Sequence, residues 1–174
     1  MLYIEKKECP AEIADEIHAI KETTDWKNIP NPSSQTLPEE KAKVTKKLRS
    51  YFDCLNKDKI RDSLLVEQHY LCAYCMSSIK NDPLHTTIEH WLPLSKSKED
   101  SLDYQNFLAT CKGGSDIDSS ALNGRRLLCC DANKGDNDEL TLDPRNREML
   151  SGITYLKDGI MEYSETSPFD HSRI

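Results

Sequence analysis

The strongest constraint on how this chain can fold is a set of cysteines that falls into two groups far apart in the sequence. Cys72 and Cys75 are separated by two residues, a spacing that lets a tight turn direct both thiolates at one tetrahedral zinc ion. Such a half-site needs a second half-site to complete it. Cys111 with either Cys129 or Cys130 can supply the second half, so we expect the fold to bring these segments together around a structural zinc ion.

The length and hydropathy of the chain indicate one ordinary domain with an accessory segment. The chain has 174 residues, which is enough to bury a real core without disulfides. No apolar run approaches the length needed to span a bilayer, and residues 1–20 lack the basic start and apolar centre of a secretory signal. We therefore expect a cytoplasmic protein without membrane contact, in which reduced cysteine clusters bind metal.

The charges are distributed unevenly along the sequence. The formal net charge is -7, yet the run from Lys41 to Arg61 carries eight basic residues against two acidic ones. Such a run is either a phosphate-facing surface or the solvated face of a helix, and the sequence leaves both interpretations open. The acidity elsewhere predicts a modest affinity for nucleic acid, or a partner that supplies part of it.

Hydrophobic periodicity predicts an α+β protein. Apolar residues recur at helical spacing over residues 11–22, 39–55 and 59–70, and a linker rich in proline and asparagine covers residues 28–38. The pattern then favours short strands at 86–88 and 107–110, an insertion loop over 112–126, a helix beginning in 131–136, and a β-hairpin of 153–155 with 160–163 around Lys157-Asp158-Gly159. We expect a helical segment over 1–66 that binds a partner, a zinc-pinned unit over 67–145, and an extension over 146–174.

Glu89 and His90 lie between the two cysteine half-sites and have the chemistry of a catalytic pair. The imidazole of an unperturbed histidine titrates at a pKa of about 6.5, so it can take a proton from water at neutral pH. A carboxylate beside it can bind a hard divalent ion such as Mg²⁺. Hydrolysis of a phosphodiester requires such a base and such a cation.

At this point the arrangement resembles the HNH endonuclease family and its ββα-metal motif. The matching residues are Cys72 and Cys75, Glu89 and His90, Asn106, Cys111, Cys130, Asp131 or Asn133, and Lys134. The resemblance implies that His90 is the general base and that Asn106 ties down the loop carrying it. It also implies that Glu89 and Asp131 hold a catalytic Mg²⁺ or another divalent ion, with Asn133 as the rival ligand, and that Lys134 lies near the phosphate.

The chain departs from the family pattern in two places. Glu89 stands where the family usually has aspartate, and seventeen or eighteen residues separate Cys111 from Cys129 or Cys130 where the family usually has two. Cys130 is the better candidate for the fourth zinc ligand, because its distance to Lys134 reproduces the Cys-x3-Lys-Gly ending of the family.

A resemblance to the HNH subunit of Septu-type anti-phage systems, a family called PtuB that also occurs with some retrons, covers nearly all of the chain. The shared strings include residues 71–75, 88–93, 111–114, 134–136 and 142–144. This resemblance implies an effector nuclease that assembles with an ABC-type ATPase of the PtuA type. DNA is the expected substrate, and RNA is the alternative.

Two other functions compete with the nuclease. The four cysteines could form a zinc-binding adaptor module in which Glu89 and His90 are structural. Alternatively, the cysteines could act as redox sensors, but a sensor does not require the Glu-His pair, Asn106 and Lys134 in this order.

Overall fold

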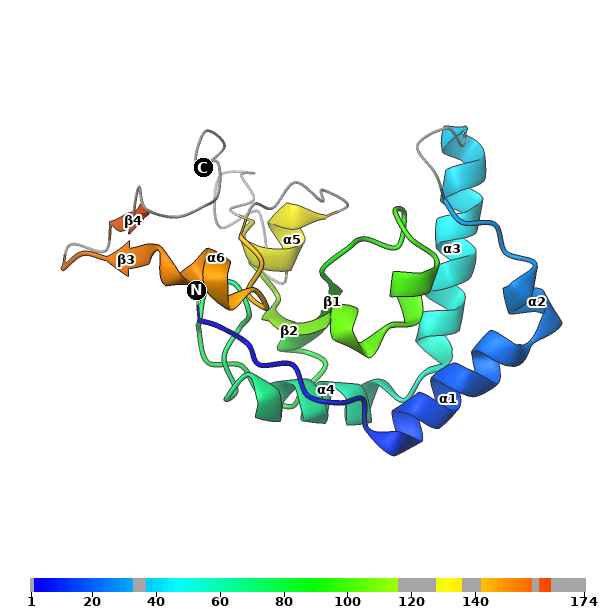
Figure 1. Cartoon of the computed structure of the whole chain (residues 1–174), viewed down its shortest axis with the longest axis horizontal. Helices are drawn as coiled ribbons and strands as arrows, with labels where there is room; N and C mark the ends of the chain where they lie inside the picture. The colour runs from blue at the N-terminus through cyan, green and yellow to red at the C-terminus, as the bar shows by residue number, and fades with distance from the viewer. Residues whose placement is uncertain (1, 33–36, 116–127, 136–141, 158–159, 164–174) are drawn as a thin grey trace.

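The structure is a computed structural model that describes residues 2–32, 37–115, 128–135, 142–157 and 160–163. Its amino-terminal part is helical (Figure 1), with α1 (Ala11–Glu22), α2 (Thr24–Lys27), α3 (Pro38–Cys54) and α4 (Lys57–Glu67). Two of these helices have side-chain N-caps. Thr23 accepts a hydrogen bond from Trp26 N at the start of α2, and Asn56 accepts one from Lys59 N at the start of α4. Both are residue types that favour the N-cap position.

An antiparallel hairpin follows the helices. It consists of β1 (Thr86–His90) and β2 (Phe107–Cys111), with Glu89 opposite Leu108 and His90 opposite Phe107. The connection between the strands contains two short 3-10 helices, η1 (Glu99–Leu102) and η2 (Tyr104–Asn106). Because successive strand residues point to opposite faces, Glu89 and His90 are directed to different sides of this hairpin.

The helices and the hairpin share one hydrophobic core. Its buried side chains include Ile13 and Ile17 of α1, Leu48 and Phe52 of α3, Ile60, Leu64 and Leu65 of α4, and Ile88, Phe107 and Ala109 of the hairpin. Helix α4 packs on both strands, and α3 packs on η1 (Figure 1). One core therefore includes residues on both sides of the boundary expected at residues 66 and 67, and the division into domains stays a prediction.

The remaining described elements lie after the insertion. Helix α5 (Cys130–Lys134) packs against β2, and α4 and α5 lie on opposite sides of the hairpin in Figure 1. Helix α6 (Arg147–Ser151) leads into β3 (Ile153–Tyr155), which pairs antiparallel with β4 (Met161–Tyr163). These strands lie where the carboxyl-terminal hairpin was expected, while Asp158 and Gly159 of its expected turn, and residues 116–126 of the expected insertion loop, lie outside the described residues.

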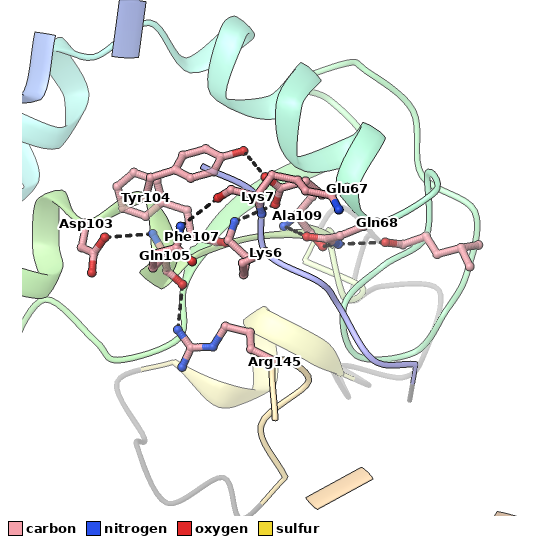
Figure 2. A network of polar contacts seen from close by, with 11 residues as sticks. Lys6, Lys7, Glu67, Gln68, Asp103, Tyr104, Gln105, Phe107, Ala109 and Arg145 are labelled. Atoms are coloured by element: carbon pink, nitrogen blue, oxygen red, sulfur yellow. Dashed lines mark hydrogen bonds and ion pairs between the residues drawn. The ribbon is translucent and has the colours of Figure 1, made fainter. Parts of the chain in front are cut away.

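The extended amino-terminal segment crosses the molecule and joins several elements (Figure 2). Lys6 Nζ donates to Glu67 Oε2 of α4 at 2.8 Å and to the carbonyl of Phe107 at 3.1 Å, and the Tyr104 hydroxyl donates to Glu67 Oε1 at 2.8 Å. Nearby, Arg145 donates to the carbonyl of Gln105. The buried carboxylate of Glu67 is thus shared between the amino-terminal segment and the loop that precedes β2.

The α+β class expected from the sequence is confirmed, with differences in detail. The short helices α2 and α6 were not expected. Helix α4 ends at Glu67, earlier than the periodicity predicted, because His69 and Tyr70 adopt left-handed φ angles of 52° and 59°, which an α-helix does not tolerate. Among the described helices, none combines the length and the apolar character that crossing a bilayer requires.

Candidate functional site

Four cysteine side chains converge between α4, β2 and α5. The sulfur atoms of Cys72, Cys75, Cys111 and Cys130 all lie within 4.8 Å of one another. The Cys72 and Cys130 sulfurs are 3.8 Å apart, and so are those of Cys75 and Cys111. Zinc–sulfur bonds of about 2.3 Å in a tetrahedron place the sulfurs about 3.8 Å apart, so this donor set can hold a metal ion such as zinc.

Local backbone geometry aims the first two thiolates. Met76 N donates to the carbonyl of Cys72, Cys72 N donates to the carbonyl of Ser77, and Met76 has a φ of 61°. This tight turn projects Cys72 and Cys75 to the same side. The amide of Cys111 donates to Cys72 Sγ at 3.3 Å, so the second half-site also supports the first.

The far end of the insertion is joined by backbone contacts to the segment that follows β2. Cys129 N donates to the carbonyl of Gly113 at 2.9 Å, and Gly113 has a φ of 56°. A Cβ at Gly113 would collide with the carbonyl oxygen of Cys129, so this close approach requires glycine. Cys130 belongs to the sulfur cluster, whereas Cys129 is exposed and stands outside it, which decides between the two candidates for the fourth sulfur.

The cysteine environments differ in electrostatics. Burial raises the pKa of the thiols of Cys72 and Cys130. Burial would also raise the pKa of Cys75, but hydrogen bonds with Ser77 and with neighbouring sulfurs lower that pKa to about 7. A bound metal ion stabilises thiolates outright, so the cluster is suited to a cation that replaces the four protons.

Helix α5 places a lysine and an aspartate against Glu89. Lys134 Nζ donates to Glu89 Oε1 at 2.5 Å and to the carbonyl of His90 at 3.0 Å. Burial, together with a hydrogen bond and the charge of Asp131, raises the pKa of Glu89 to about 8 against the lowering effect of Lys134. The buried Glu89 and the half-buried Asp131 therefore lie together with a single cation, and such a position favours additional positive charge.

A tyrosine that the sequence analysis missed links this acidic position to the metal cluster. Tyr74 lies between Cys72 and Cys75, and its hydroxyl donates to Glu89 Oε1 at 3.3 Å. Its ring also contacts Trp91. No sequence signal distinguishes Tyr74 from any other residue between two ligands, because its role depends on the approach of β1.

His90 lies on the other side of the hairpin and is enclosed. Its ring is 4.4 Å from that of Phe52 and 5.0 Å from that of Phe107, and its exposed fraction is 4%. Nε2 is 3.1 Å from the carbonyl oxygen of Ser101. Because a carbonyl can only accept, Nε2 carries the proton and Nδ1 keeps the lone pair. Burial, with the nearby charge of Arg49 and other cations, lowers the pKa of His90 to about 3.

Asn106 holds the segment that follows His90. Its side-chain amide donates to the carbonyls of Leu92 and Asp100, and its Oδ1 accepts from Leu92 N at 2.8 Å. The Asn106 carbonyl also accepts from Trp91 N. A buried asparagine with these contacts fixes the loop at both ends, next to the Ser101 carbonyl that accepts the hydrogen bond from His90 Nε2.

The structure thus assembles the predicted residues into three groups. The four sulfurs form one group, and Glu89, Asp131 and Lys134 form the second. His90 and Asn106 form the third on the far side of β1, while Asn133 is exposed on α5. Phe52, Tyr74 and Ser101 complete these environments. Helical periodicity indicates Phe52 only as a core residue, and no sequence signal connects any of the three with a site.

The chain was compared with models of protein families and with the curated proteins. Neither a scan against models of protein families nor a search of the curated proteins finds a match to this chain.

Proposed function

We propose that this chain is a zinc-stabilised endonuclease of the HNH type that hydrolyses phosphodiester bonds of DNA with the help of a divalent ion such as Mg²⁺. The observation that carries the proposal is the meeting of the buried Glu89 and Lys134 with the half-buried Asp131, on the short helix that begins at Cys130 of the four-sulfur cluster. A hydrolase for a phosphodiester needs concentrated positive charge beside a base.

The acidic position fits a hard cation by its donor set. Glu89 and Asp131 would hold the ion, with the amide of Asn133 as the alternative ligand on the same helix. The ion would neutralise charge that develops on the phosphate and on the leaving oxygen. Lys134 contributes its own ammonium group to the same place and holds Glu89 while no phosphate is bound.

His90 would act through Nδ1. The hydrogen bond from Nε2 to Ser101 leaves the Nδ1 lone pair as the atom that accepts a proton from water. The low pKa keeps the ring neutral, and the negative charge of a bound phosphate raises the basicity of a nearby imidazole. Asn106 would position this base by holding the loop that contains Ser101, whose carbonyl accepts the hydrogen bond from His90 Nε2.

We further propose that the chain is the effector subunit of an anti-phage complex with an ABC-type ATPase. The support is the resemblance of its short motifs to Septu-type nuclease subunits, together with the net charge of -7, which disfavours strong autonomous binding to nucleic acid. Co-expression and co-purification with such an ATPase test this part of the proposal.

A non-catalytic adaptor is the second candidate, and one observation favours it. Both members of the Glu-His pair have partners within the protein: Glu89 is paired with Lys134, and His90 is enclosed by aromatic rings. In an adaptor these contacts would only stabilise the hairpin.

In the deciding experiment, supercoiled plasmid is incubated with Mg²⁺ and the zinc-loaded chain, once without the ATPase and once with it. The same assay is repeated with His90→Ala and Glu89→Gln. Nicking by the wild type that both variants lose, with zinc content and folding retained, supports the nuclease. Identical behaviour of wild type and His90→Ala in both settings refutes it. Loss of complex formation in His90→Ala without any nicking favours the adaptor, and a parallel assay on RNA assigns the substrate.

A further inference from the structure

The basic run of the sequence lies along α3 and the start of α4, and its charges are only partly paired. Outside this run the chain carries 15 basic residues against 28 acidic ones. Lys43, Lys46, Lys47 and Arg49 are exposed on α3, and none of the ion pairs between described residues includes any of them. The molecule therefore concentrates unpaired positive charge on one helix, while acidic residues outnumber basic ones in the rest of the chain.

Helical spacing divides these cations between two flanks of α3. At 3.6 residues per turn, Arg49 and Lys47 lie on opposite flanks of the exposed face of α3, with Lys46 nearer to Arg49 and Lys43 nearer to Lys47. The flank of Arg49 continues into Lys57 at the start of α4, whose ammonium group is paired with Asp53 at 2.7 Å. We call Lys46, Arg49 and Lys57 the basic edge.

The basic edge adjoins the enclosed histidine through Phe52. The guanidinium carbon of Arg49 is 5.7 Å from the centre of the Phe52 ring, and Lys57 Nζ is 4.1 Å from it. The same ring is 4.4 Å from that of His90. Both cations thus lie within about 10 Å of the imidazole, roughly the Debye length at 0.1 M ionic strength, so an anion bound to them interacts directly with the His90 environment.

We propose that the basic edge binds the phosphate backbone of a DNA duplex and leads it to the end of β1, where the reaction would take place. This inference rests on the proposed nuclease function and names the surface by which the substrate enters. Charge complementarity supports DNA as the occupant, because each strand carries one phosphate per 3.4 Å of helix axis and the acidic excess in the rest of the chain disfavours binding of the duplex elsewhere. Nothing in the edge reads base edges, so binding is independent of sequence.

The test compares two double variants that remove the same charge from the same helix. Lys46→Gln with Arg49→Gln removes two members of the basic edge, and Lys43→Gln with Lys47→Gln is the matched control on the other flank. Binding of a fluorescent DNA duplex to the zinc-loaded full chain is measured by anisotropy against salt concentration, without Mg²⁺. Since each phosphate contact contributes about 0.9 to the slope of log K against log salt, the edge variant should lose about 2 from this slope and roughly 10-fold in affinity at low salt.

The outcomes separate this inference from the proposed function. A control variant that behaves as wild type, with the loss confined to the edge variant, supports the inference. Equal losses in both variants, no loss in either, or a wild type that does not bind the duplex overturns it. An edge variant that binds DNA normally but no longer co-purifies with the ATPase assigns the edge to a protein partner and also overturns it. Plasmid nicking is measured separately. If the chain binds DNA through the basic edge but does not nick plasmid, the proposed nuclease function is refuted and the basic edge remains a DNA-binding surface.

Discussion

Glu89 and His90 are adjacent residues whose side chains have opposite surroundings. Glu89 faces α5, where Lys134 and Tyr74 donate to its carboxylate. His90 faces the helical side, where Phe52 and Phe107 enclose its ring. The pleat of a strand produces this separation.

The burial of His90 predicts a specific dependence of stability on pH. Its pKa in the folded chain is about 3, below the ordinary value of 6.5 for a histidine. Below about pH 6.5 the unfolded chain binds a proton that the folded chain does not, so the free energy of unfolding falls as the pH decreases from 6.5 towards 3, by up to about 1.4 kcal/mol per pH unit. His90→Gln retains a donor for Ser101 but does not titrate.

Urea unfolding of wild type and His90→Gln at a series of pH values between 6.5 and 5 checks this prediction. We expect the free energy of unfolding of the wild type to depend more steeply on pH than that of the variant, by the uptake of about one proton on unfolding. Titrating groups common to both proteins cancel in the difference. Parallel curves for the two proteins would show that His90 is accessible to protons in the folded chain.

At the scale of elements, the four-sulfur cluster determines where α5 lies. Helix α5 spans only Cys130–Lys134, too short to be stable alone. It begins at Cys130, whose φ of 52° is in the left-handed region, and such a conformation costs free energy unless the surroundings enforce it. Metal binding by the four sulfurs would supply that enforcement and hold Lys134 and Asp131 against Glu89.

The adjacent pair Cys129 and Cys130 offers a matched test of this cluster. We expect Cys130→Ser to lower bound zinc substantially below one equivalent and to reduce the midpoint of thermal unfolding, because a structural zinc ion contributes folding free energy directly. Cys129→Ser should retain both, since Cys129 is exposed and outside the cluster. Zinc is measured by elemental analysis of the purified chains. Loss of zinc in Cys129→Ser but not in Cys130→Ser would show that Cys129, and not Cys130, is the fourth ligand.

At the scale of the whole molecule, the amino-terminal segment connects parts of the fold that are distant in sequence. Its backbone at Ile4 donates to the carbonyl of Pro144 at 2.8 Å. Lys6 and Glu67 form an ion pair whose side chains are 6% and 4% exposed. Removing the carboxylate of such a pair leaves a cation buried without its counter-charge, and burial already lowers the pKa of Lys6.

We therefore predict that Glu67→Gln destabilises the chain by about 3 kcal/mol. The pair between Glu5 and Lys7 is the control, because its side chains are 67% and 62% exposed, and exposed pairs contribute little. Glu5→Gln should leave the urea midpoint unchanged. Equal midpoints for the two variants would mean that the contacts of Glu67 with Lys6 and Tyr104 do not support the fold.

Spacing and periodicity by themselves determined the α+β class, the helices over residues 11–22 and 39–54, the two central strands and the convergence of cysteines, because these depend on patterns within short stretches of chain. The tertiary structure decided what depends on contacts between distant segments. It placed Cys130 rather than Cys129 at the cluster and ended α4 at Glu67. It also enclosed His90 between Phe52 and Phe107. The hydrogen-bond donors to Glu89 are Tyr74 and Lys134. Burial and the choice of partner are properties of the packed chain, and no local pattern encodes which distant side chain will arrive.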